Sequence, residues 1–440
     1  MSLSARFSLG LSLGALIATA VLATAAQAQT GTPISLFAPG TERTEPPPGE
    51  GVRGMRPETV GAVAYFTVSP QASRSLRSPK PGPTQMRIAL PGGKDVTCAL
   101  QSDKASAGGV TLSGSVGDDA LSSCDLHISD GKVNGLIDTD AGRFRIMPVG
   151  KGGTHAVVEV KDEAFPKEED RVLQPPLPPA PDKRSMRDEA PCDVMPANGK
   201  PKQAGPLRIL VLYTPNAASD TADIKGDIAL MMARFNETLS LNRNFKVKAE
   251  LAAALPVDYT EAGDMETDLD RLSGKVDGYF GDVRQIRDKY KADLVHMLIR
   301  GSGDACGIGW LLDPKRADSA DWGFSLSDRE CAMSNYSFIH EIGHNLGLNH
   351  DRAVVTNAGS DEFNFGYVDI PHKIRTVMAY NDACAEEHVN CRRLPVYSTP
   401  NLAYQGLPLG KAADASDGGD YNAELLCRNA PAAAKFAETR

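Results

Sequence analysis

The sequence predicts two folded parts: a β-rich first half and an α/β second half built on a mixed, mostly parallel sheet. At 440 residues the chain is longer than a typical single domain. Residues 61–172 contain short alternating apolar runs, separated by turn signals such as Asp130-Gly131, and this pattern favours hairpins. From Leu207 onward, apolar strands alternate with stretches of helical periodicity, which is typical of a parallel sheet with helices packed on it.

Composition and charge narrow the function classes. Hydrophobic residues make up 41% and charged residues 23%, which excludes a wholly disordered chain, a collagen and a multi-span membrane protein. The net charge is −9, and the excess of acidic residues lies in the second half. This balance argues against nucleic acid or an anionic membrane as the main partner.

The N-terminus has the layout of a secretory signal. Arg6 precedes an apolar run that ends near Leu22, and Ala26-Gln27-Ala28 follows. We therefore expect residues 1–28 to be a signal peptide cleaved after Ala28, with an uncleaved anchor as the alternative. No other stretch is apolar enough to cross a bilayer, so no membrane insertion is expected once the signal is removed. The mature chain would be periplasmic or extracellular, and its eight cysteines are interpreted first as disulfides.

The expected β-rich part covers residues 29–172 and begins with a lead-in, 29–60, that is rich in proline and glycine. Strands are predicted over 62–68, 85–90 and 143–147, and Cys98 and Cys124 are expected to pair. Residues 173–206 contain Pro175-Pro-Leu-Pro-Pro-Ala-Pro181 and then a basic stretch, which predicts an extended linker open to proteolysis.

The second half, residues 207–440, carries the alternating elements. We predict strands over 208–213, 247–257 and 293–299, and helices over 221–241 and 278–292.

The candidate metal-binding and catalytic residues lie in one segment, His340-Glu-Ile-Gly-His344-Asn-Leu-Gly347-Leu-Asn-His350-Asp351. On a helix, residues four apart share a face, so His340 and His344 aim at one point. Gly347 can adopt the backbone turn that ends the helix, after which the chain swings back and His350 supplies a third nitrogen. Three neutral imidazoles leave the fourth tetrahedral position open, which a catalytic zinc ion requires.

Glu341 follows the first histidine and is close enough to reach a water on the metal without being a ligand. One catalytic Zn²⁺ would lower the pKa of that water toward neutrality. Glu341 would then accept its proton as a general base and pass it to the leaving amine.

This motif resembles that of the metzincin zinc metalloendopeptidases, and the aspartate after the third histidine resembles the adamalysin/reprolysin branch. The resemblance implies a metzincin-like catalytic domain with a zinc helix. It also implies that Thr376-Val-Met378-Ala-Tyr380 is the Met-turn of that clan. Tyr380 lies two residues after the methionine, and this position resembles that of a tyrosine in astacin-type enzymes. The resemblance implies that Tyr380 ligates the metal or steadies the oxyanion.

The sequence of residues 206–405 as a whole is similar to the sequences of bacterial secreted metalloendopeptidases of the peptidyl-Asp type. The metzincin resemblance implies an edge strand ahead of the zinc helix that pairs with an extended substrate, here Gly307, Ile308 and Gly309. The peptidyl-Asp likeness implies that a positively charged side chain binds an acidic side chain of the substrate. Arg375 and Lys373 are the candidates for that charge. Residues 135–155 also resemble reprolysin propeptides, which implies that the first half is a pro-segment inhibiting its own enzyme.

The remaining cysteines leave one question open. Cys306 with Cys331, and Cys384 with Cys391, have spacings that suit local bridges. Cys192, at the end of the linker, is either a thiolate on the zinc, acting as a cysteine switch, or the partner of Cys427.

We therefore predict a secreted, monomeric zinc endopeptidase that cleaves proteins or peptides, with a possible preference for acidic residues, and is made as a zymogen. One alternative is a binding or adhesion module on an inactive protease fold. Another is that the β-rich half is a permanent binding domain.

Overall fold

The computed structural model describes residues 32–77, 82–102, 108–117, 119, 121–150, 153–167, 173–178, 192, 204–242, 247–276, 278–281, 283–301, 303–355, 363–416 and 418–439. The described residues from Pro33 onward form one compact unit. The expected signal peptide and the basic part of the linker lie outside the described residues. Among the residues described, no helix is both long and apolar enough to cross a membrane.

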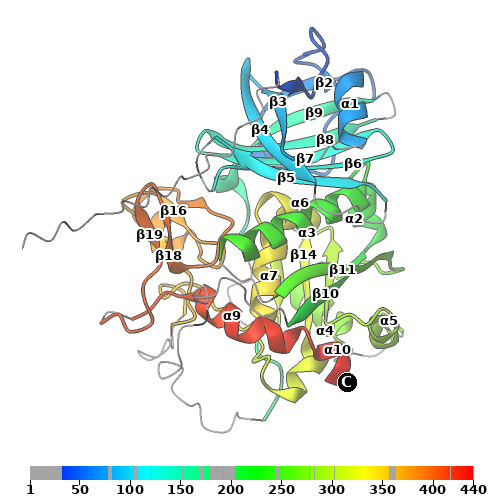
Figure 1. The fold of residues 1–440 in the computed structure, drawn as a ribbon. Coiled ribbons are helices and arrows are strands. Elements are labelled where there is room, and N and C mark those ends of the chain that lie inside the picture. Colours follow the sequence, from blue (N-terminus) through cyan, green and yellow to red (C-terminus); the bar gives the residue numbers. More distant parts are fainter. Residues whose placement is uncertain are drawn as a thin grey trace, which may run out of the picture. The chain divides into compact units, whose positions relative to one another are not determined.

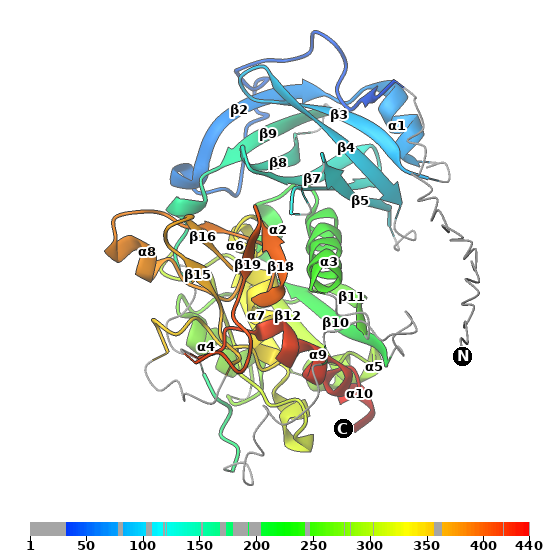
Figure 2. The same ribbon diagram turned by 60° about the vertical axis from the view of Figure 1, so that its left-hand side comes forward.

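The first half is a nine-stranded sheet with the order β1-β3-β4-β5-β6-β7-β8-β9-β2 (Figures 1 and 2). Its strands are β1 Ile34–Ser35, β2 Val60–Thr67, β3 Thr84–Leu90, β4 Lys94–Ser102, β5 Val110–Val116, β6 Ser123–Ser129, β7 Lys132–Thr139, β8 Gly142–Val149 and β9 Thr154–Val160. Only the short β1–β3 pair is parallel among these strands. The predicted hairpins are therefore present, and the predicted Cys98–Cys124 disulfide joins β4 to β6.

The second half is built on a five-stranded sheet with the order β11-β10-β12-β14-β13, in which only the edge strand β13 is antiparallel. Its strands are β10 Gly205–Tyr213, β11 Val247–Pro256, β12 Leu294–Ile299, β13 Gly307–Gly309 and β14 Phe324–Asp328. Two small sheets follow, made of β15 Val368–Asp369, β16 Ile374–Arg375 and β17 Arg392–Arg393, and of β18 Thr399–Tyr404 and β19 Leu407–Leu409.

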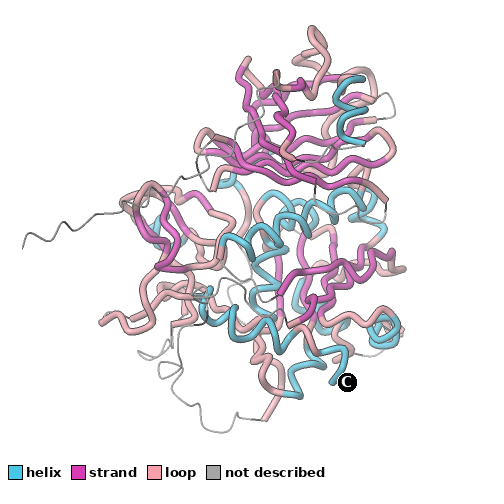
Figure 3. Tube along the Cα trace, in the orientation of Figure 1, coloured by secondary structure: helices cyan, strands magenta, loops and turns pink. Residues whose placement is uncertain are grey.

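Helices surround the second sheet, whereas the first sheet carries the short α1 (Figure 3). The helices are α1 Pro70–Arg77, α2 Pro215–Ser219, α3 Ile224–Leu241, α4 Met265–Leu272, α5 Val283–Lys289, α6 Arg329–Ser334, α7 Ser337–Asn345, α8 Asp382–Glu386, α9 Asn422–Ala433 and α10 Phe436–Thr439; 3-10 turns cover Pro57–Thr59, Asp162–Ala164 and Ala317–Trp322. Helix α7 packs on β13 and β14, and α9 packs on β10 (Figure 1). The predicted second helix is shorter than expected, because it begins at Val283 rather than near residue 278.

The first and second halves share a buried, charged interface. On β8, Phe144 and Ile146 point into the core of the nine-stranded sheet. The alternate residues Arg143 and Arg145 point the other way and are nevertheless only 4% and 2% exposed. Arg145 forms an ion pair with Asp227 of α3 at 3.1 Å. The charged face of this strand is therefore covered by the second half and not by solvent.

Candidate active site

The histidine motif lies where its spacing predicts. His340 and His344 are on α7, and the helix ends at Asn345. The amide of Leu348 donates to the carbonyl of Gly343 and the amide of Gly347 donates to His344, at 3.0 and 2.9 Å. This hydrogen-bond pair is a Schellman cap, which requires a left-handed residue, and Gly347 has φ +89°. The chain then reverses and returns His350 to the same point.

The three ring nitrogens converge. The Nε2 atoms of His340, His344 and His350 are 3.0 to 3.2 Å from one another, and all three side chains are buried. Two nitrogen ligands at 2.0–2.1 Å from a tetrahedral zinc ion are about 3.3–3.4 Å apart. The donor set and its spacing therefore fit a zinc ion closely.

The outer nitrogens of two histidines contact the backbone. Nδ1 of His344 lies 2.9 Å from the carbonyl of Leu348, which can only accept, so the proton is on Nδ1 and the Nε2 lone pair is free for a metal. Nδ1 of His340 lies 2.9 Å from the carbonyl of Val377 and 2.6 Å from Nη2 of Arg393.

Burial keeps the imidazoles neutral. It lowers the pKa of His344 to about 4 and lowers the pKa of His340 and His350 well below the usual value. For His340, the neighbouring His344 and Arg393 lower the pKa further. Neutral imidazole is the form that binds metal, so burial favours the form of each ring that a metal requires.

Glu341 lies against the edge strand. A Cβ placed on Gly307 would be 2.6 Å from Glu341 Oε1, and one on Gly309 would be 3.2 Å from Oε2. These two glycines therefore make room for the carboxylate. The structure brings the predicted substrate-binding strand and the predicted general base into contact, with Ile308 buried between the glycines.

The predicted Met-turn packs beneath α7. A Cβ on Gly343 would be 2.7 Å from Sδ of Met378, so the helix needs a glycine for this approach. The ring of Tyr380 lies over His350, with centroids 4.2 Å apart. Asp351 accepts a hydrogen bond from the amide of Tyr380 at 2.8 Å, which ties the end of the zinc motif to this turn.

Arg375 lies close to this turn but is buried. Its Nε donates to the carbonyl of Cys391 at 3.1 Å and its Nη1 to that of Ala379 at 2.6 Å. Its positive charge also helps to lower the pKa of Asp351, against the larger raising effect of burial. Its predicted contact with an acidic substrate side chain stays a prediction.

The cysteine-switch hypothesis for Cys192 is wrong. Cys192 is bonded to Cys427 of α9, and a disulfide sulfur is not a thiolate that could bind zinc. The two predicted local bridges, Cys306–Cys331 and Cys384–Cys391, are present.

Two residues that shape the histidine site, Arg393 and Gly343, were not predicted from the sequence. Arg393 is buried beside His340 and donates through Nε to the carbonyl of Val377 at 2.9 Å and through Nη1 to that of Asn335 at 2.8 Å. Nothing in the local sequence distinguishes it. Gly343 did carry a signal, because a glycine inside a helix costs stability and often marks close packing.

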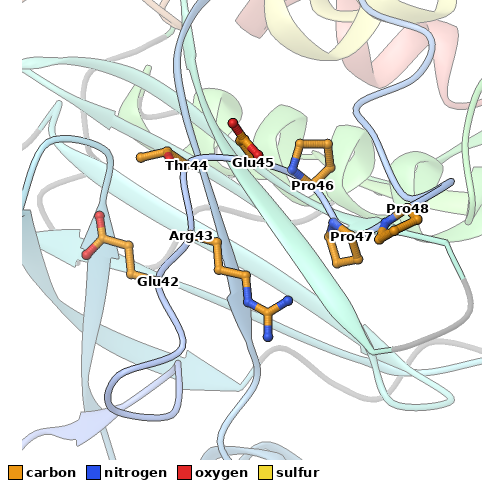
Figure 4. A pocket seen from close by; sticks show the side chains of 7 residues that line it. All are labelled: Glu42, Arg43, Thr44, Glu45, Pro46, Pro47 and Pro48. Atoms are coloured by element: carbon orange, nitrogen blue, oxygen red, sulfur yellow. The ribbon is translucent and has the colours of Figure 1, made fainter.

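A separate hollow of about 610 Å³ is lined by residues 42–48 and contains none of these side chains (Figure 4).

Three convergent neutral imidazoles with an adjacent carboxylate define a metal-dependent hydrolase site. Residues 207–389 match metallopeptidase family M12. The chain is 29% identical to a peptidyl-Asp metalloendopeptidase of Stenotrophomonas maltophilia, over 92% of this chain and 94% of that one. It is 30% identical to one of Xanthomonas campestris pv. campestris, over 76% and 75%. The chain therefore belongs to metallopeptidase family M12 and is a metalloendopeptidase.

Among solved structures, a metalloproteinase from Bacteroides fragilis matches 61% of this chain and 81% of its own, with 10% identity and a TM-score of 0.39. A likeness at that score says nothing about function.

Proposed function

We propose that this protein is a secreted zinc endopeptidase in which Glu341 is the general base. The observation that carries the proposal is the convergence of three Nε2 atoms within 3.2 Å of one another, one residue away from Glu341. A zinc ion bound there supplies Lewis-acid polarisation of the scissile carbonyl and lowers the pKa of a bound water to about 7.

The chain's own residues supply the rest of the reaction. Glu341 accepts the proton of the attacking water at a carboxylate oxygen and delivers it to the leaving amide nitrogen. The edge strand Gly307–Gly309 aligns an extended peptide by backbone pairing beside that carboxylate. The role proposed for Tyr380, whose ring packs on His350, is to steady the developing oxyanion.

We further propose that the β-rich half, residues 29–172, is a pro-segment that inhibits its own enzyme. The support is that Lys167 and Leu173, which follow β9, bond to residues on either side of β13. Cys306 donates its amide to the carbonyl of Lys167 at 2.9 Å, and Leu311 donates to Leu173 at 2.8 Å. Leu173 also forms a parallel bridge with Trp310. In this arrangement latency comes from a segment bonded on either side of the substrate strand and not from a cysteine ligand.

The substrate is proposed to be protein, with a preference for acidic side chains. The relatives are named peptidyl-Asp metalloendopeptidases, and Arg375 is the nearest candidate cation to the Met-turn. Four disulfides and the signal-like N-terminus support an oxidising location outside the cytoplasm. We propose a monomer.

The test is casein and peptide-library digestion by the secreted protein before and after cleavage of the linker. We expect activity that a chelator abolishes and zinc restores, higher in the cleaved form, with an acidic residue enriched at one subsite. Equal activity before and after cleavage, with an N-terminus near Gln29 in the secreted material, would instead support a permanent β-rich domain.

A binding module on an inactive fold is not favoured, because the three histidines and Glu341 are all present. Absence of any chelator-sensitive cleavage would reverse that judgement.

A further inference from the structure

The turn that carries the third histidine is held at every carbonyl oxygen from residue 346 to residue 350. Each accepts one hydrogen bond from a specific donor outside the turn's own backbone. The pairs are Leu346 with Nδ2 of Asn429 (2.9 Å), Gly347 with Nδ2 of Asn364 (3.1 Å), Leu348 with Nδ1 of His344 (2.9 Å), Asn349 with Nδ2 of Asn422 (3.2 Å) and His350 with the amide of Gly366 (3.1 Å).

Three of the five donors are asparagine side chains that lie far along the chain from the helix. Asn422 and Asn429 are seven residues apart on α9, so they share one face of that helix. They are 0% and 3% exposed, and Asn364 is half-buried. We call Asn364, Asn422 and Asn429 the asparagine clamp.

The chemistry of these contacts requires a hydrogen-bond donor. A carbonyl oxygen can only accept, so Nδ2 must face it. The Oδ1 atoms of all three side chains have no hydrogen-bond partner among the described residues. Their polar contribution is therefore concentrated in the bond that each donates to the turn. Asparagine is also short, so its nitrogen position is closely defined by its backbone.

The clamp contacts the part of the motif that helix geometry does not fix. His340 and His344 are placed by α7, but His350 follows a reversal of the chain at Gly347. Nδ2 of Asn429 lies 2.7 Å from where a Cβ on Gly347 would be, so the clamp also packs directly against that reversal.

We propose that the asparagine clamp consists of positioning residues for the third metal ligand. The clamp fixes the backbone of residues 346–350 and thereby presents Nε2 of His350 before any metal binds. Without it, metal binding must itself order the turn, which lowers affinity. This inference rests on the proposed zinc site and adds residues that hold it in shape. Losing a group that orients a metal ligand typically weakens metal binding about 10- to 100-fold.

The test replaces single donors in the full chain. Asn429→Asp and Asn422→Asp keep the shape of the side chain but put an oxygen against a carbonyl oxygen. Asn429→Ala removes the donor without adding charge and provides the measurement if an aspartate variant does not fold. The matched control is Asn236→Asp. Asn236 lies on α3 and bonds to Ala249 of β11. Its Nδ2 donates to the carbonyl of Ala249 at 3.0 Å, and its Oδ1 accepts from the amide of Ala249 at 2.9 Å.

Zinc affinity is measured by competition with a chromophoric chelator, and the ligand geometry by the d–d absorption of the cobalt-substituted protein. Urea unfolding of the metal-free form reports stability separately. We expect clamp variants to bind zinc about 10- to 100-fold more weakly, with an altered cobalt spectrum. The Asn236→Asp control should lose stability but keep the wild-type zinc affinity.

Clamp variants that bind zinc within twofold of wild type, with an unchanged cobalt spectrum, would overturn the inference. So would an equal loss of affinity in the control, because the effect would then follow general stability. If the wild-type chain itself bound no zinc, the proposed function would fail instead, and the two failures are thus distinguishable.

Discussion

The contact between Gly307 and Glu341 gives the sharpest prediction. In the Gly307→Ala variant, the new methyl carbon would lie 2.6 Å from Oε1 and 2.9 Å from Cγ of Glu341. Ordinary contacts of a carbon atom are about 3.5 Å or longer, so a displacement of roughly 0.9 Å is required.

The strand cannot easily supply that displacement. Gly307 is paired with Ser327 of β14, and the adjacent Cys306 is bonded to Cys331 of α6. The carboxylate therefore moves. A misplacement of about 1 Å in a reacting group costs roughly 100-fold in rate. We expect kcat to fall by about that factor, while zinc content is unchanged because the three imidazoles are untouched.

The assay is hydrolysis of a fluorogenic peptide by the linker-cleaved enzyme, with zinc determined on the same samples. Gly301→Ala is the matched control. Its new methyl would meet the end of the Met265 side chain at 3.0 Å, and that side chain can turn away. A Gly307→Ala enzyme with kcat within threefold of wild type would mean that the contact between Gly307 and Glu341 does not set the position of the carboxylate.

Three further predictions concern the base, a buried histidine and the cysteines. Glu341→Gln should keep its zinc but lose about 10²- to 10⁴-fold in kcat, and retained turnover would exclude Glu341 as the base. Burial lowers the pKa of His296 to about 3, so below pH ~6.5 the unfolded chain binds a proton that the folded chain does not. The free energy of unfolding should therefore fall with decreasing pH, by up to about 1.4 kcal/mol per pH unit from this residue. Urea titrations of His296→Gln should show a shallower dependence, and an identical slope would contradict the assignment. The denatured, unreduced chain should react with no thiol reagent, whereas two reactive thiols would mean that Cys192 and Cys427 are not bonded.

The sequence predicted what depends on local periodicity and spacing. His340, Glu341, His344 and Gly347 are related by fixed steps along one helix and its cap, so their geometry follows from the chain near them. Helix α3 was predicted to within three residues of its start, because its apolar positions recur at helical spacing.

The buried interface could not be predicted in this way. The alternation Arg143-Phe144-Arg145-Ile146 indicates a strand with one apolar face, and such a strand usually exposes its charges. Here Arg143 donates to the carbonyls of Ser334 and Arg393, which lie 191 and 250 residues further along. No local pattern links such distant partners.

The asparagine clamp was missed for the same reason. Asn422 and Asn429 look like ordinary polar positions of a C-terminal helix, and only the folded chain places them against the turn before His350. Residues that orient a site from elsewhere in the chain leave no signature beside the motif.

Binding of one zinc ion by His340, His344 and His350 beside Glu341 can be observed in diffraction from zinc-loaded crystals of the full chain, recorded on both sides of the zinc absorption edge. We expect an anomalous peak about 2.0–2.1 Å from all three Nε2 atoms. No peak between those rings, or a zinc ion held by other side chains, would contradict it.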